Sequence, residues 1–110
     1  MKNFKEYARH ILDEINFIKN HCTGKSFDDF NNDELLKRAI IRSLEIIGEA
    51  VKNIPQDILD QYPNTEWKNI AKTRDRLIHH YFGIDYTIVW DIVEKHIDLL
   101  KQDIDSILAT

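Results

Sequence analysis

Cysteine, glycine and proline are scarce in this chain of 110 residues, and each shortage excludes a class of structure. The single cysteine, Cys22, excludes an internal disulfide and is typical of a reducing compartment. Three glycines and two prolines leave few turn signals, which predicts long regular elements joined by short connections. The length is close to the commonest domain size, so we interpret residues 1–110 as a single domain.

Long apolar runs and familiar site motifs are also missing. No stretch approaches the ~20 apolar residues that span a bilayer. Charges interrupt the N-terminal segment every few residues, unlike the apolar centre of a signal peptide. We therefore expect a cytoplasmic protein with no membrane partner. The residues show no glycine-rich phosphate loop or Ser-His-Asp pattern, and no second ligand pair follows His21 and Cys22 at zinc spacing, so we expect no cofactor and no metal.

The charge is uneven along the chain. The net charge of −4 argues against non-specific binding of nucleic acid over the whole surface. Residues 68–82 nevertheless carry a net +3, which leaves −7 on the other residues. An acidic body with one basic region is typical of a local anion site.

Apolar residues recur at steps of three and four along nearly the whole chain, which is the helical period. The pattern predicts long helices over residues 3–22, 34–54, 67–82 and from 86 to about 107, with a short helix or turn over 56–62. We expect the stretch FDDFNND, residues 27–33, to be a polar connection. The predicted fold is all-α, an antiparallel bundle of four main helices plus a short helix.

Glycines and N-cap residues set the expected helix ends. Gly24 is placed to end the first helix, and Asn32 or Asp33 can cap the second. Thr65 is the expected cap of the third helix and Asp85 of the last. Gly83 is expected to close the third helix.

The second predicted helix has two features that bear on function. Ala39, Ser43 and Ala50, with Gly48 nearby, are small enough to let another helix approach closely. Its charged residues step by four, three and four along one face; they are Arg38, Arg42, Glu45 and Glu49. One interpretation is an exposed stripe of ion pairs. The other is that Glu49 or Glu45 reaches across to hold Arg74.

The third helix ends in the stretch RDRLIHHYFGID, which contains two arginines, two histidines and a tyrosine. At 100° per residue, Arg74 and Tyr81 lie within about 20° of each other on one stripe, and His79 is rotated from Arg74 by about 140°. Arg74 and His79 could meet at one ligand across the helix end or through a second copy of the helix. The geometry favours a homodimer.

This combination of residues suits phosphate chemistry. Arginine offers a planar fork of donors that matches phosphate oxygens, and histidine exchanges protons near neutral pH. Together they could take the proton of a ribose 2′-hydroxyl, stabilise the phosphorane and protonate the leaving oxygen without a metal. The same residues also fit an alternative in which they only cap the helix end and extend their charged groups into solvent.

The remaining histidines fit structural roles. His80 could lie at the edge of the core, and His96 lies in an apolar stripe, where we expect a partly buried histidine. His10 and His21 are expected at the surface.

Arg74, His79 and Tyr81 form the pattern R-x4-H-x-Y, which is followed by FGID and an apolar helix. With the upstream segments RAIIRSLEIIGEAVKNIP and WKNIAKTRDRLIHHY, the chain resembles the HepT-like family of the HEPN superfamily over about residues 5–107. The resemblance implies one all-helical, dimeric HEPN/HepT-like domain that acts as a metal-independent RNase toxin of a type VII toxin–antitoxin system. It also implies a partner, an MNT-domain nucleotidyltransferase antitoxin that neutralises the toxin by AMPylation.

The resemblance assigns roles residue by residue. Arg74 and His79 would be catalytic, and Tyr81 would be the tyrosine that accepts AMP. Asp75 would orient the arginine. Apart from the resemblance, we expect Glu49 and Arg76 to support the site. An alternative function of a different class remains open, namely a non-catalytic helical adaptor that dimerises and docks a nucleotidyltransferase.

Overall fold

The computed structural model describes residues 3–79 and 83–110, and for residues 78 and 79 it describes the backbone only. The described part is all-helical, as predicted, and its helices are α1 (Phe4–Cys22), α2 (Phe27–Asn31), α3 (Glu34–Val51), α4 (Gln56–Leu59), α5 (Trp67–His79), α6 (Tyr86–Lys95) and α7 (Ile97–Leu108). None of these helices is long and apolar enough to cross a membrane.

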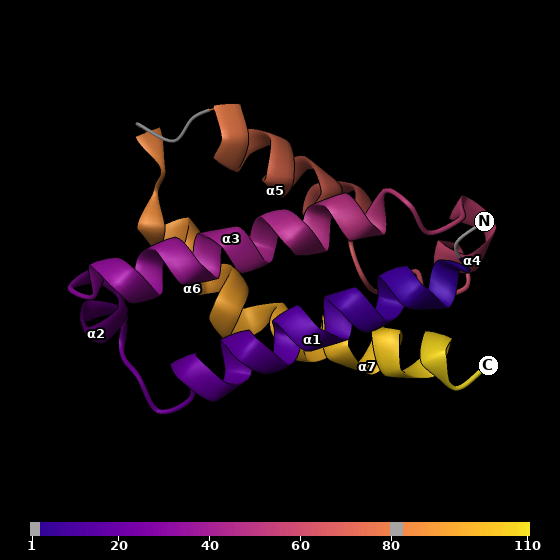
Figure 1. Ribbon diagram of the computed structural model, residues 1–110, viewed down its shortest axis with the longest axis horizontal. Helices are drawn as coiled ribbons and strands as arrows, with labels where there is room; N and C mark the ends of the chain where they lie inside the picture. The colour runs from indigo at the N-terminus through magenta and orange to yellow at the C-terminus, as the bar shows by residue number, and fades with distance from the viewer. Residues whose placement is uncertain (1–2, 80–82) are drawn as a thin grey trace.

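The long helices pack side by side as a bundle. Helix α3 lies between α5 and α1, and α1 also packs against α7. Helices α5, α3, α1 and α7 each run antiparallel to the one before (Figure 1). The core lies between them and is built from the apolar stripes that the sequence predicts, including Ile11, Ile15, Ile40, Ile47 and Ile104.

Several predicted helix ends are confirmed. The Asp33 side chain accepts a hydrogen bond from the amide of Leu36 at the start of α3. Asp85 accepts one from Thr87 at the start of α6. Gly24 adopts a φ of +81°, the left-handed conformation that follows many helix ends.

Some expectations about the elements are wrong. The stretch expected as a polar connection carries α2, which begins at a capping box between Ser26 and Asp29. Phe30 of α2 is completely buried and stacks on Trp90, with ring centroids 5.0 Å apart. The second helix ends at Val51, and residues 52–54 leave it before Pro55.

The expected last helix is two helices, α6 and α7, which meet at His96. No glycine or proline marks this break, and the packing of Ile97 and Leu100 in the core sets the course of α7. His96 is exposed at the break, with Nε2 3.8 Å from Asp91 Oδ2, and Ile88 is exposed too. His96 was expected in the apolar stripe of a continuous helix.

Thr65 does not act as expected either. Its hydroxyl donates a hydrogen bond to Asp103 of α7, while the amides of Asn69 and Ile70 in the first turn of α5 donate to the carbonyl of Glu66. Thr65 therefore ties the start of α5 to α7. Residues 80–82, at the end predicted for this helix, lie outside the described residues; Gly83, which was expected to close it, is described and exposed.

Helices α3 and α5 approach each other closely at Gly48. A β-carbon added at Gly48 would lie 2.5 Å from Arg74 Cβ and 3.0 Å from the carbonyl oxygen of Ile70. This confirms the prediction that the small residues of the second helix let another helix come close. Gly48 thereby places Arg74 directly over α3.

Replacing Gly48 by alanine is expected to destabilise the protein. Overpacking of this kind costs roughly 1–3 kcal/mol, whereas the better helix propensity of alanine returns about 1 kcal/mol. We expect a net loss of about 1 kcal/mol, measured as a lower urea midpoint. Gly83→Ala is the matched control, because a β-carbon there meets nothing within 4 Å. Equal midpoints for Gly48→Ala and the unmodified protein would contradict the close contact.

Candidate functional site

Helix α5 carries the predicted arginine and is anchored at both ends. Trp67 and Leu77 are buried in the core, and the indole N–H of Trp67 donates a hydrogen bond to the carbonyl of Tyr62. Arg74 lies between these anchors and faces α3. Its side chain is 32% exposed, so the guanidinium lies at the edge of the core with access to solvent.

Two carboxylates hold the Arg74 guanidinium. Nε lies 3.3 Å from Glu49 Oε2 of α3, and Nη1 lies 3.2 Å from Asp75 Oδ1. One interpretation of the charged face of α3 was that Glu49 or Glu45 holds Arg74, and the structure shows this contact from Glu49. The surface ion pairs are present as well, since Arg42 lies 3.8 Å from Glu45 and Arg38 3.9 Å from Glu34.

Asp75 links Arg74 to a second cation. Its carboxylate accepts hydrogen bonds from Lys52 Nζ at 2.9 Å and from Arg74 Nη1 at 3.2 Å. The hydrogen bond from Lys52 and, to a smaller extent, that from Arg74 lower the pKa of Asp75 from its ordinary value. Asp75 is therefore an anion at neutral pH that joins the end of α3 to α5.

Of the other predicted residues around Arg74, the structure describes the side chain of Arg76 but not those of His79 and Tyr81. Arg76 is exposed, and a step of two residues rotates it by about 200° from Arg74, so it faces away from this arginine. His79 is the last residue of α5, and its side chain is not described. Tyr81, with His80, lies outside the described residues. That His79 and Tyr81 act together with Arg74 therefore stays a prediction.

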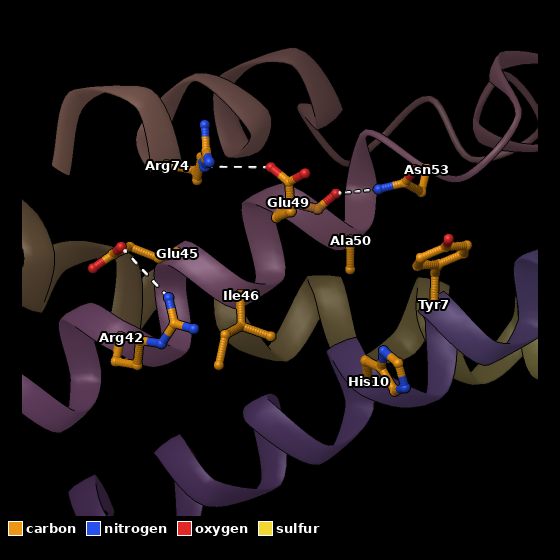
Figure 2. Close-up of a pocket in the computed structure, with 9 residues that line it drawn as sticks. All are labelled: Tyr7, His10, Arg42, Glu45, Ile46, Glu49, Ala50, Asn53 and Arg74. Carbon is orange, nitrogen blue, oxygen red and sulfur yellow. Dashed lines mark hydrogen bonds and ion pairs between the residues drawn. The ribbon is translucent and has the colours of Figure 1, made fainter. Parts of the chain in front are cut away.

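Beside Arg74 the surface is hollowed into a cavity of about 320 Å³ between α1, α3 and α5. Its lining residues are Tyr7, His10, Arg42, Glu45, Ile46, Glu49, Ala50, Asn53 and Arg74. Figure 2 shows Tyr7 and His10 on α1 and the charged residues on α3, with Arg74 on α5 above them. The cavity thus combines two arginines, two carboxylates, an imidazole and a phenol.

Sequence reasoning did not predict Tyr7, His10 or Asn53 as site residues. His10 is exposed, as expected, but it also lines the cavity, and its ring meets that of Tyr7 edge-on at 6.2 Å between centroids. The Asn53 side chain donates a hydrogen bond to the carbonyl of Glu49 at 2.9 Å. The one available signal was the spacing of Tyr7 and His10, which places both on one face of α1.

Metal-binding side chains are not grouped in the described part of the chain. Within residues 3–79 and 83–110, no group of three or more His, Cys, Asp or Glu side chains is arranged to hold one. The polar groups of the cavity are instead arranged as cation–carboxylate pairs.

The fold is thus that of an all-helical protein, and the half-buried Arg74 beside a cavity gives it a candidate phosphate site. The family model described as "Ribonuclease HepT-like" matches residues 11–107. The chain therefore belongs to the ribonuclease HepT-like family, and this membership supports a ribonuclease function.

Similar proteins occur in bacteria and archaea. "Putative RNase TTE0752" of Caldanaerobacter subterraneus subsp. tengcongensis is 46% identical over 98% of this chain and 96% of its own length. "Putative RNase MJ0127" of Methanocaldococcus jannaschii is 43% identical over 97% and 88%. "Probable ribonuclease HepT" of Thermococcus cleftensis is 39% identical over 96% of each chain. No solved structure matches this chain significantly.

The lowered pKa of Asp75 predicts how its contribution to stability depends on pH. The group is bound as an anion in the folded state, so its contacts stabilise the fold above pH 3.8, its ordinary pKa, and this contribution is lost as the pH falls through the lowered value. The difference in urea midpoint between the unmodified protein and Asp75→Asn should therefore be largest near pH 7 and shrink below pH 4. Asp13→Asn, at an exposed acid of α1, is the control. A difference that is constant from pH 7 to pH 3 would contradict this role of Asp75.

Proposed function

We propose that this protein is a metal-independent endoribonuclease that cleaves RNA by attack of the ribose 2′-hydroxyl on the adjacent phosphate. His79 acts as the general base or acid, and Arg74 stabilises the charge of the phosphorane. The observation that carries the proposal is the position of Arg74, which two carboxylates hold at the edge of a cavity in a member of a ribonuclease family.

The contacts of Arg74 leave capacity for a substrate phosphate. A guanidinium has five N–H donors in a planar fork, and the two carboxylates engage Nε and Nη1. Glu49 and Asp75 thus restrict the orientation of the side chain before the substrate binds. A preoriented cation costs little rearrangement during the reaction, which is the main source of electrostatic catalysis. The nearby carboxylates also favour release of the anionic product.

We further propose that the active form is a homodimer. Arg74 and His79 are five positions apart and rotated by about 140° on the helix, so two copies related by a two-fold axis bring two such pairs to one groove. Each copy would then contribute to the binding of one RNA strand. Measuring the oligomeric state in solution, and the distance between the Arg74 residues of the two copies, tests this arrangement.

Regulation is proposed to act through Tyr81. In the type VII toxin–antitoxin arrangement, an MNT-domain nucleotidyltransferase serves as antitoxin, and the Tyr81 hydroxyl attacks the α-phosphate of ATP. A phosphate–tyrosine bond forms, pyrophosphate leaves and the hydroxyl proton is released. Tyr81 shares a helix stripe with Arg74. The attached adenylate would therefore compete with RNA phosphate for the guanidinium and fill the groove.

A non-catalytic adaptor is the second candidate function. The net charge of −4 favours it, because proteins that bind nucleic acid mainly through charge are usually basic. In this case the chain would dimerise and dock the nucleotidyltransferase, and any bound RNA would remain intact. Cleavage assays distinguish the two functions.

The nuclease proposal predicts cleavage of RNA in the presence of EDTA, followed as the appearance of fragments on a gel. His79→Ala should reduce the rate by roughly 10²–10⁴-fold, the usual contribution of a general acid or base. Arg74→Ala should reduce it by about 10²–10³-fold. Arg9→Ala, at an exposed arginine of α1, should cleave normally. RNA carrying 2′-O-methyl groups should stay intact, because it has no nucleophile.

Two results would overturn this assignment. Equal cleavage by His79→Ala and the unmodified protein indicates a contaminating nuclease and supports the adaptor. Loss of cleavage in EDTA, restored by magnesium, indicates a metal-dependent reaction at another site.

The regulatory proposal predicts that ATP, magnesium and the cognate nucleotidyltransferase add at least one AMP to the peptide containing Tyr81. Tyr81→Phe should fold normally and take up none, as measured by mass spectrometry. Tyr86→Phe is the matched control and should be labelled normally; the Tyr86 ring packs against Phe30 and lies under the ammonium group of Lys37. Labelling of Tyr86 in place of Tyr81 would rule out the assignment.

A further inference from the structure

The cavity beside Arg74 extends well beyond the groups that the proposed reaction needs. The arginine lies on α5 at one side, and Tyr7 and His10 lie on α1 at the other (Figure 2). Between them, α3 contributes the apolar surface of Ile46 and Ala50. A volume of about 320 Å³ is at the small end of ligand sites, which suits one nucleotide and not a longer segment.

The charges in the cavity are balanced in pairs. Arg74 lies 3.3 Å from Glu49, and Arg42 lies 3.8 Å from Glu45. A cavity that bound only phosphate would be expected to carry an excess of cations. The combination present here, with polar groups around apolar and aromatic surface, is suited to a flat ligand that has hydrogen-bonding edges. A nucleobase has this chemistry, because its face can lie on apolar surface such as that of Ile46 while its edge meets polar side chains.

Glu45 lines the cavity and is not engaged by Arg74; Figure 2 shows its carboxylate turned toward Arg42 and away from Tyr7 and His10. Its side chain is 20% exposed, whereas that of Glu49 is 54% exposed and is engaged by Arg74. The distance of 3.8 Å from Glu45 to Arg42 is longer than a hydrogen bond, so the carboxylate retains capacity to accept one from a ligand. Glu45 precedes Glu49 by one helix turn, roughly 6 Å along α3. Because Glu49 holds Arg74, the proposed phosphate-binding cation and Glu45 line the same cavity.

We propose that this cavity binds the nucleobase next to the phosphate held by Arg74, and that Glu45 makes the site prefer guanine. Guanine presents two adjacent donors, N1–H and the 2-amino group, which match the two oxygens of a carboxylate. Uracil presents a single N–H between two carbonyl oxygens, which a carboxylate repels. Glu45 is thus a specificity-determining residue. The inference rests on the proposed function, and it assigns that nuclease a substrate class, namely RNA that is unpaired at a guanosine.

Binding of mononucleotides tests the cavity without requiring catalysis. The probes are guanosine 3′-monophosphate and uridine 3′-monophosphate, titrated into the full-length protein by calorimetry. We expect tighter binding of the guanosine nucleotide. Glu45→Gln should weaken its binding by roughly tenfold, because a hydrogen bond to a charged group is lost, and should leave the uridine nucleotide unaffected or improved. Circular dichroism confirms that the variant folds.

Matched variants separate the base from the phosphate. Glu34→Gln makes the same change at an exposed acid of α3 outside the cavity lining, and it should leave both affinities unchanged. Arg74→Ala should weaken both nucleotides by a similar factor, because they share the phosphate. Equal affinities of the unmodified protein for the two nucleotides would overturn the inference. An unchanged preference in Glu45→Gln would also overturn it.

Cleavage maps distinguish failure of this inference from failure of the nuclease proposal. On an unstructured RNA of mixed sequence, we expect cuts next to guanosine that become indiscriminate in Glu45→Gln. Cleavage without a base preference would refute the guanine site and leave the nuclease standing. Selective binding of the guanosine nucleotide without any cleavage would refute the nuclease and leave a guanine-binding cavity.

Discussion

The close contact of α3 and α5 at Gly48 is the constraint on which the site depends. A β-carbon there would meet the side chain and backbone of α5, so a larger residue would push the two helices apart. The next residue of α3, Glu49, is therefore close enough to reach the Arg74 guanidinium across the interface. One glycine thus determines both the packing distance between two helices and the orientation of the proposed catalytic cation.

Around that contact, charge is arranged to orient groups more than to attract a polyanion. Lys52, Asp75, Arg74 and Glu49 alternate in sign and join α3 to α5. Pairs this exposed contribute little to stability, typically under about 1 kcal/mol each. Their main effect is to hold long side chains in one arrangement. An enzyme that carries net negative charge can still bind RNA if a few cations are placed in advance, and this reconciles the composition of the chain with membership of a ribonuclease family.

The helices that are easiest to predict are those with uninterrupted apolar periodicity. Helices α1 and α3 follow such stripes, and the caps at Asp33 and Asp85 are strong local signals. Helix α2 was missed because its composition is polar, although the Ser26–Asp29 capping box and the spacing of Phe27 and Phe30 were available signals. The break at His96 has no such signal, because packing in the core and not local chemistry determines it.

The sequence by itself determined the all-helical class, the apolar stripes that form the core and the R-x4-H-x-Y pattern, because these features depend on spacing along one helix. Only the tertiary structure decided that Glu49 and not Glu45 holds Arg74, that Asp75 also binds Lys52, and that Tyr7 and His10 share a cavity with Arg74. The reason is physical. Contacts between helices depend on how closely and at what rotation they pack, and no periodicity within one segment encodes that distance.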